Sequence, residues 1–340
     1  METKDNNYTL RITDLHVYFN IINGQVRAVN GLNLYVRPGE SVGVGGETGC
    51  GKSVAMKAVM GLLPPEARIP RGEILYQYAD GRVVDVAVLK NQSAELLNIR
   101  RVGMSMIFQE PSASLSPLHT VYQQMQEAIS GREKMNRKQR TNECVRLLTL
   151  VGISQPERWV KEYPFRLSGG MAQRVMIAQA IAKNPNLLFA DEPTTALDVT
   201  VQAQVLNLLN RLRKELNISM VFITHNMGIM AHMTERIYII YLGKVVETAK
   251  TADLFKNPLH PYTKGLIACT PTLGLSKSTR LYNIAGMVLP NDAFIKGCNY
   301  YHRCEKFMPG LCDKVLPLEV DLGNEHKVSC HLYTREEIGK

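Results

Sequence analysis

The stretch GETGCGKS, residues 46–53, decides how the surrounding chain must fold. It satisfies the pattern G-x-x-x-x-G-K-[ST] through Gly46, Gly51, Lys52 and Ser53. Glycines let the backbone curl so that successive N–H groups point at phosphate oxygens, and a following helix N-terminus adds partial positive charge. We therefore predict a phosphate-binding loop between a strand and a helix. Lys52 is expected to reach the β- and γ-phosphates of the ligand, and Ser53 to supply an oxygen to Mg²⁺.

The sequence around this loop predicts an α/β fold with a mostly parallel sheet. Apolar residues recur at helical spacing between 201 and 216, which gives a face that can cover a sheet. The segment 110–165 lacks a convincing strand, and we interpret about 110–175 as a helical insertion. Amphipathic stretches alternate with short apolar runs that are expected to be buried strands, at 41–45, 104–108, 186–190 and 219–224.

Polar side chains follow three of the predicted strands. Asp191 and Glu192 are adjacent carboxylates that a strand end would place beside the phosphate loop. We expect Asp191 to hold Mg²⁺ directly or through water, and Glu192 to polarise the attacking water. The alternative is a solvated pair that opens a turn. Gln109 and His225 could face the γ-phosphate from the same crevice. The alternative is that each only forms hydrogen bonds with backbone groups of its loop.

Composition and charge restrict the class of protein. The 340 residues suggest about two domains, and 45% hydrophobic with 21% charged residues is ordinary for a globular protein. No apolar run approaches the ~18 residues that span a bilayer, and the N-terminus does not resemble a signal peptide. The net charge of +9 favours anionic partners such as nucleotides, nucleic acid or an acidic membrane face.

Four of the seven cysteines lie near the C-terminus with the spacing C-x5-C-x7-C-x17-C. Structural zinc sites usually contain close C-x2-4-C pairs, whereas iron–sulfur clusters tolerate wider spacing. The spacing therefore favours an iron–sulfur cluster, with a Zn²⁺ site and unliganded thiols as alternatives. The predicted ligands are Cys298, Cys304, Cys312 and Cys330.

Further motifs give the chain a family resemblance. It resembles the ATPase subunit of an ABC transporter through LSGGMAQR (167–174), DEPTTALD (191–198) and THNMG (224–228). It is more closely similar to the dipeptide, oligopeptide and nickel importer branch through MIFQEPSASLSP, NPLHPYTKGL and a cysteine pattern that ends in CHL. The similar cysteines of some such ATPases bind a [4Fe–4S] cluster.

The resemblance implies an ABC-type P-loop NTPase with an antiparallel β subdomain. Residues 8–260 correspond to the nucleotide-binding domain, and residues 261–340 correspond to an oligopeptide-transporter-type region with the four-cysteine site. It also implies that the whole loop binds ATP, through Gly46, Glu47, Thr48, Gly49, Cys50, Gly51, Lys52, Ser53 and Val54.

Within the family pattern, Ser168, Gly169 and Gly170 form the signature loop, which contacts the γ-phosphate of ATP bound by the opposite subunit. A hydroxyl and bare amides before a helix suit an anion, in agreement with that role. ATP would then join two ATPase subunits, and hydrolysis would release them.

The resemblance assigns four more positions. Gln109 corresponds to the Q-loop, which contacts Mg²⁺ or water, and His225 corresponds to the switch histidine that grips the γ-phosphate. Asp198 corresponds to the D-loop, although it could be only a helix cap. An upstream aromatic stacks on adenine in this family, for which Phe19 is the candidate and Tyr18 the rival. The alternative is that Phe19 is only a buried core residue.

The implied function is an ATP-hydrolysing motor that imports dipeptides or oligopeptides. We expect two permease subunits, a second homologous ATPase, an extracellular binding protein and a peripheral position on the cytoplasmic face of the membrane. No nucleic acid is expected. The alternatives are an importer ATPase for nickel or another small solute, a soluble ABC ATPase acting on nucleic acid or the ribosome, and a subunit that holds ATP without turnover. Glu192 and His225 argue against the last.

Overall fold

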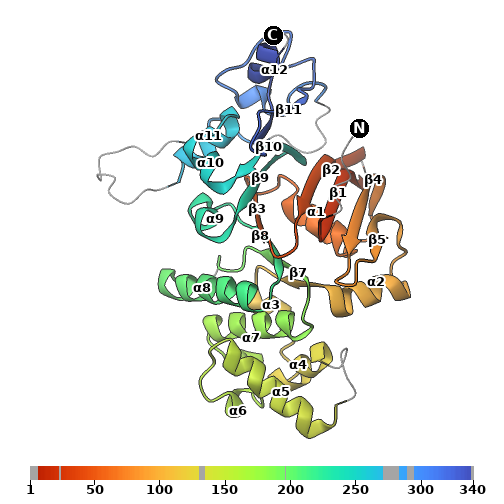
Figure 1. The fold of residues 1–340 in the computed structure, drawn as a ribbon, viewed down its shortest axis with the longest axis vertical. Coiled ribbons are helices and arrows are strands. Elements are labelled where there is room, and N and C mark those ends of the chain that lie inside the picture. Colours follow the sequence, from red (N-terminus) through yellow and green to blue (C-terminus); the bar gives the residue numbers. More distant parts are fainter. Residues whose placement is uncertain are drawn as a thin grey trace.

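Two β-sheets carry the fold, and helices pack on both faces of the larger sheet (Figure 1). In the larger sheet, the strands from β9 through β6 are parallel, and β10, β12 and β11 continue it in antiparallel pairing. The order is β11 (Glu319–Asp321), β12 (Lys327–Ser329), β10 (Lys244–Lys250), β9 (Arg236–Tyr241), β3 (Ser41–Gly45), β8 (Ser219–Ile223), β7 (Leu187–Asp191) and β6 (Met104–Ile107). This is a computed structural model that describes residues 7–22, 24–129, 135–195, 197–270, 283–288 and 295–337.

The predicted α/β class with a mostly parallel sheet is confirmed, because all four predicted strands belong to the parallel part. Successive side chains of a strand point to opposite faces, and β7 shows the result. Leu187 and Phe189 lie in one hydrophobic cluster, whereas Leu188 and Ala190 lie in the cluster on the other face.

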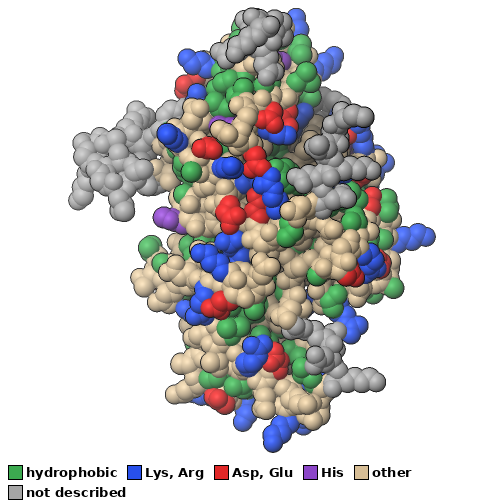
Figure 2. Space-filling model, in the orientation of Figure 1, with side chains coloured by type: hydrophobic (Ala, Val, Ile, Leu, Met, Phe, Trp, Pro, Cys, Tyr) green, Lys and Arg blue, Asp and Glu red, His purple; other side chains and the backbone are tan. Residues whose placement is uncertain are grey.

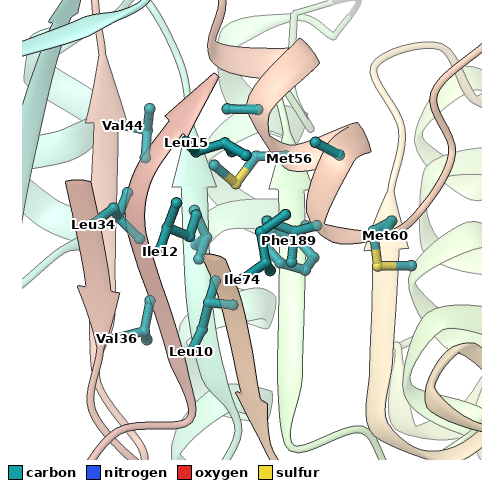
Figure 3. Close-up of a cluster of buried hydrophobic side chains, with 14 of the residues drawn as sticks. Leu10, Ile12, Leu15, Leu34, Val36, Val44, Met56, Met60, Ile74 and Phe189 are labelled. Atoms are coloured by element: carbon teal, nitrogen blue, oxygen red, sulfur yellow. The ribbon is translucent and has the colours of Figure 1, made fainter. Parts of the chain in front are cut away.

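The smaller sheet is antiparallel and covers one face of the larger sheet together with α1 (Lys52–Val59). Figure 3 shows Leu10, Ile12 and Ile74 of this sheet close to Met56 of α1 and Phe189 of β7. The sheet order is β2 (Gly24–Val36), β1 (Leu10–Ile21), β4 (Ala67–Gln77) and β5 (Val83–Asp85).

Helices cover the opposite face and fill the segment predicted to be a helical insertion. In the described parts of that segment, 108–129 and 135–175, no strand occurs. These helices are α3 (Pro111–Ser114), α4 (Val121–Ile129), α5 (Arg137–Leu150), α6 (Pro156–Trp159), α7 (Gly169–Ala182), α8 (Val199–Glu215) and α9 (Met227–Met233). Helix α2 (Ala94–Asn98) packs instead with the smaller sheet, through Leu96. Short turns of helix are η1 (Val86–Val88), η2 (Ile99–Gly103) and η3 (Pro164–Arg166).

The C-terminal region is joined to the sheet that carries the phosphate loop. Strand β12 pairs with β10, with Glu247 opposite Val328. The predicted domain division at residue 260 stays a prediction. The remaining helices are α10 (Thr251–Lys256), α11 (Pro261–Ala268), η4 (Tyr301–Arg303) and α12 (His331–Glu337). None of the helices described is both long and apolar enough to cross a bilayer.

Candidate functional site

The predicted phosphate loop connects the end of β3 to the start of α1. Its backbone lies so close to neighbouring strands that two positions cannot carry a side chain. A Cβ on Gly46 would lie 2.3 Å from the carbonyl oxygen of Ile240, and one on Gly51 would lie 2.2 Å from that of Ala28. The tip of the loop, Thr48 and Gly49, is exposed. The loop is therefore fixed at both ends and open at its tip.

Lys52 begins α1 and points back into the loop. Its Nζ donates to the carbonyl oxygens of Gly46 at 2.7 Å and Glu47 at 2.8 Å. The side chain is buried, with only 6% of the residue exposed. Buried cations need paired acceptors, and phosphate oxygens could replace these two carbonyls. The position of the ammonium group inside the loop fits the predicted contact with phosphates.

Ser53 and Asp191 meet beside the loop, as their predicted shared role requires. Ser53 Oγ donates to Asp191 Oδ1 at 3.1 Å. Burial raises the pKa of Asp191, while the hydrogen bond from Ser53 acts in the opposite direction. A hydroxyl and a carboxylate are oxygen ligands of the type that Mg²⁺ prefers. A cation placed there would relieve the desolvation of the carboxylate, so these two residues fit the predicted Mg²⁺ ligands.

Glu192 and His225 form a second pair at the ends of β7 and β8. His225 Nδ1 lies 2.9 Å from Glu192 Oε1, and Thr195 Oγ1 donates to Glu192 Oε2 at 2.9 Å. Burial acts to raise the pKa of Glu192, but the hydrogen bonds from His225 and Thr195 outweigh it and the net pKa is lowered. The carboxylate is therefore ionised at neutral pH and can accept a hydrogen bond from water.

The backbone of Glu192 is unusual, because its φ of 45° is left-handed for a residue with a side chain. Its N–H donates to the carbonyl oxygen of Ile223 at 2.9 Å, which holds this conformation. Strained residues of this kind cluster at functional sites. The strain supports a functional role for Glu192 independently of its pKa.

The structure describes Gln109 and Phe19 but does not test their predicted roles, and within the described ranges no hydrogen bond fixes the side chain of Gln109. Gln109 is exposed just after β6, whose neighbour β7 leads to Asp191. Phe19 is half-buried against the main core. An irregular register between Val17 and Tyr18 interrupts the simple alternation on which the choice of Phe19 depended. The roles of both residues stay predictions.

The predicted signature loop lies next to the predicted D-loop. Ser168 caps α7 by accepting from the N–H of Met171 at 3.3 Å. A Cβ on Gly170 would lie 2.8 Å from Val201 of α8, so the start of α7 is pressed against α8. Asp198 caps α8 by accepting from Thr200 and Val201, which was the alternative interpretation of this residue.

The structure does not bring the signature loop together with the phosphate loop of the same chain. Helix α7 packs on the helical layer, α3, α4, α5 and α8, and on β6, rather than on α1. Figure 1 shows the separation of α7 from α1. A hydroxyl at a helix N-terminus is nevertheless available for an anion from another molecule.

Sequence reasoning missed two residues that hold the phosphate loop from the C-terminal region. Arg303 of η4 forms an ion pair with Glu47, and its Nη1 lies 2.7 Å from Glu47 Oε2. The hydroxyl of Tyr262 accepts from the N–H of Glu47 at 2.8 Å. These partners are more than 200 positions apart in the chain, and no local pattern signals their meeting.

The predicted four-cysteine metal centre is wrong. In the described ranges, which include all four cysteines, no group of three or more His, Cys, Asp or Glu side chains could hold a metal ion. The thiols are free, and burial raises the pKa of Cys298 to about 12 and that of Cys330 to about 11. Metal binding requires thiolates, whereas these groups pack in apolar clusters. Neither the [4Fe–4S] cluster nor the Zn²⁺ alternative is supported.

Two families match different parts of the chain. Residues 29–195 match a family described as ABC transporter, and residues 246–312 match one described as the C-terminal region of oligopeptide/dipeptide transporters. The chain is 40% identical over 326 residues to the dipeptide transport ATP-binding protein DppD of Bacillus subtilis, covering 95% of this chain and 94% of that protein. It is 42% identical to the oligopeptide transport ATP-binding protein OppD of the same organism, covering 82% and 76%.

Solved structures agree with these similarities. The dimeric ATP-binding cassette MJ0796, in a post-hydrolysis state bound to ADP and Pi, has a TM-score of 0.62 and 27% identity. The similarity covers 71% of this chain and 98% of that one. CbiO1 of Clostridium perfringens, part of the ABC transporter complex CbiONQ, has a TM-score of 0.60 and 25% identity, covering 74% and 92%.

Proposed function

This chain belongs to the ABC transporter ATPase family, and we propose that it is the ATP-hydrolysing motor subunit of an importer of dipeptides or oligopeptides. Relatives matched over 82% to 96% of this chain are ATP-binding subunits of dipeptide and oligopeptide transporters. Residues 246–312 match the C-terminal region of such transporters, which favours a peptide importer over an ABC ATPase of another kind.

The observation that carries the proposal is the meeting of three elements at one sheet edge. The phosphate loop, the Ser53–Asp191 pair and the Glu192–His225 pair follow β3, β7 and β8, which are neighbours in the sheet. Parallel strands bring their carboxyl ends to a common crevice, where ligands bind. If the loop were only a turn, the ionised carboxylate and the left-handed backbone of Glu192 at the same sheet edge would have no explanation.

The residues divide the reaction between binding and proton transfer. The loop amides and Lys52 hold the β- and γ-phosphates. Ser53 and Asp191 would hold Mg²⁺, which neutralises charge on the phosphate oxygens when bound. Glu192 accepts a hydrogen bond from the attacking water and takes its proton as the water oxygen bonds to the γ-phosphorus. The bond from that phosphorus to the bridging oxygen breaks, and ADP and phosphate leave.

We further infer that the site is completed by a second ATPase subunit. Ser168, Gly169 and Gly170 lie at the N-terminus of α7, away from the phosphate loop of their own chain. Their exposed hydroxyl and amides suit the γ-phosphate of ATP held by a partner. By similarity to peptide transporter ATP-binding subunits, we propose that the partner is a second, homologous ATPase and that the pair works with two permease subunits and an extracellular binding protein.

We infer that ATP bound at the site is one anionic partner that the net charge of +9 favours. On the face shown in Figure 2, basic and acidic side chains are interspersed rather than gathered into one basic surface. Nucleic-acid binding depends on a continuous basic surface that neutralises phosphates. The visible face therefore gives no support to the nucleic-acid alternative.

The test is peptide uptake by the transporter assembled with its permeases in proteoliposomes. Lys52→Ala should lower ATPase turnover at least about 100-fold, as loss of a group that stabilises transition-state charge does. Uptake of a dipeptide and of a longer oligopeptide should fall with it. Lys214→Ala is the matched control, because Lys214 is exposed on α8 far along the chain from the loop. Undiminished turnover in Lys52→Ala would refute the proposed site.

A further inference from the structure

Glu47, the second residue of the phosphate loop, makes three contacts that point in different directions. Its carbonyl oxygen accepts from Lys52 Nζ at 2.8 Å. Its N–H donates to the hydroxyl of Tyr262 at 2.8 Å, and its carboxylate accepts from Arg303. One contact holds the catalytic lysine, and the other two lead out of the loop into the C-terminal region.

Arg303 is built into this position rather than lying on the surface. Its side chain is only 4% exposed and pairs with both carboxylate oxygens of Glu47, through Nη1 at 2.7 Å and Nη2 at 3.0 Å. Its Nε donates to the carbonyl oxygen of Ala285 at 2.9 Å. Such a two-pronged pair fixes the orientation of the carboxylate as well as its distance.

Tyr262 is held equally firmly, by packing. Its ring is fully buried and meets the ring of Tyr241 edge-on, with centroids 4.7 Å apart. Tyr300, three positions before Arg303, contacts both of these rings at 5.2 and 5.3 Å. Three tyrosines from β9, α11 and the segment before η4 thus form a rigid base beneath Glu47.

We propose that Arg303 and Tyr262 are positioning residues for ATP binding, through which the C-terminal region holds the phosphate loop in its nucleotide-binding shape. The proposal rests on the proposed function, because it assumes that the loop binds ATP. It assigns to the region 246–312 a direct part in nucleotide affinity.

The physical reason is preorganisation. The loop must present its amides and Lys52 to the phosphates, and any disorder in the free loop is lost as entropy on binding. Tyr262 and Arg303 fix the backbone and the side chain of Glu47 before ATP arrives. Neither side chain needs to touch the nucleotide, so their loss should weaken binding more than it slows the chemical step.

A second ion pair between the same two parts of the chain offers a matched control. Arg37 pairs with Glu325, which lies in the C-terminal region between β11 and β12. The side chains of this pair are 36% and 30% exposed, and none of the hydrogen bonds described for them reaches the phosphate loop. Its removal tests whether attachment of the C-terminal region alone accounts for an effect of Arg303.

The experiment measures binding of a fluorescent ATP analogue to the full chain and the ATPase kinetics of the assembled transporter. Arg303→Met should raise Kd and KM about ten-fold, the loss expected for a charge-assisted hydrogen-bonded pair, with kcat at saturating ATP changed less than about two-fold. Arg303→Lys should be intermediate, since it keeps the charge but not the fork. Arg37→Met should bind as the wild type does.

Two further variants keep the proposal testable if Arg303→Met does not fold. Tyr262→Phe retains the ring but removes the acceptor for Glu47, and should weaken binding several-fold. The double variant Glu47→Gln/Arg303→Met should bind ATP no more weakly than whichever single variant, Glu47→Gln or Arg303→Met, binds it less tightly. The two substitutions break the same Glu47–Arg303 interaction, so their effects should not add. Additive effects, wild-type affinity in the folded Arg303 and Tyr262 variants, or an equal loss in Arg37→Met would each overturn the proposal. Failure of the wild type to bind ATP would instead refute the proposed function.

Discussion

Gly51→Ala is the substitution that the structure predicts to damage the phosphate loop through contact with neighbouring backbone. The new Cβ would lie 2.2 Å from the carbonyl oxygen of Ala28, in β2, and 3.3 Å from Cα of Gly243. Relief requires a backbone shift of about 1 Å, and overpacking of this kind costs about 1–3 kcal/mol. The φ of 98° adds about 1–2 kcal/mol for any L-residue. We expect the free energy of unfolding to fall by about 2–5 kcal/mol.

Gly49→Ala is the matched control, because Gly49 lies in the same loop with a φ of 83°, but a Cβ there would meet no atom of the described chain within 4 Å. The free energy of unfolding of Gly49→Ala should fall only by the cost of a positive φ for an L-residue, about 1–2 kcal/mol. The assay is urea unfolding of each variant without nucleotide, followed by circular dichroism. The difference between the two variants isolates the contact with Ala28.

Equal losses in the two variants, or a larger loss in Gly49→Ala, would refute the reasoning. Either result would mean that the loop can move away from β2 at no cost. The effect of Gly49→Ala on ATP binding need not follow its small effect on the free energy of unfolding. Gly49 lies at the exposed tip of the loop, where we expect the phosphates to approach. A shift of about 1 Å at Gly51 should also lower turnover about 100-fold when ATP is supplied.

Three other predictions address the active pair, the core and pH. Glu192→Gln should allow ATP binding without hydrolysis, so size exclusion with ATP and the partner ATPase should show a stable dimer; only separate subunits would contradict this. Glu40→Ala should cost about 3–5 kcal/mol in urea unfolding, because it leaves the guanidinium of Arg236, 2% exposed, buried and unpaired. Glu325→Ala should cost less than about 1 kcal/mol, since the side chains of its pair with Arg37 are 36% and 30% exposed. Burial lowers the pKa of His260 from 6.5 to about 4. Between these two pH values the unfolded chain therefore binds more protons at this residue than the folded chain does. Stability should be complete above pH 6.5 and fall by about 3 kcal/mol as the pH decreases to 4. His260→Asn keeps an acceptor for capping α11 and should flatten this slope; an unchanged slope would count against it.

Much of the ATP site was predictable because its chemistry is local. The loop residues from Gly46 to Ser53 are contiguous, and the strand before them and the helix after them follow from apolar periodicity. Asp191 meets Ser53 of the loop and Glu192 follows it, because parallel strands end at one edge of the sheet. Each inference used neighbours in sequence or a general rule of sheet topology.

The four-cysteine prediction failed because it depended on tertiary packing, which local sequence does not specify. Spacing counts residues between thiols but does not say how deeply each thiol is buried in apolar surroundings. Burial then decided the outcome, because Cys298 and Cys312 pack with tyrosines and aliphatic residues in one cluster, and Cys330 packs with Leu259 and Val328 in another. A protonated thiol is a small apolar group, and it needs no metal to be stable there.

The amino-acid order alone determined the phosphate loop, the strand ends that carry its partner carboxylates, and the possible helix cap at Asp198. These depend on backbone and side-chain preferences over a few residues. Only the tertiary structure decided that Glu47 would be held by Tyr262 and Arg303, residues 215 and 256 positions away. That contact exists because the C-terminal region packs against β9 and β10, and long-range packing is not encoded in any short stretch of sequence.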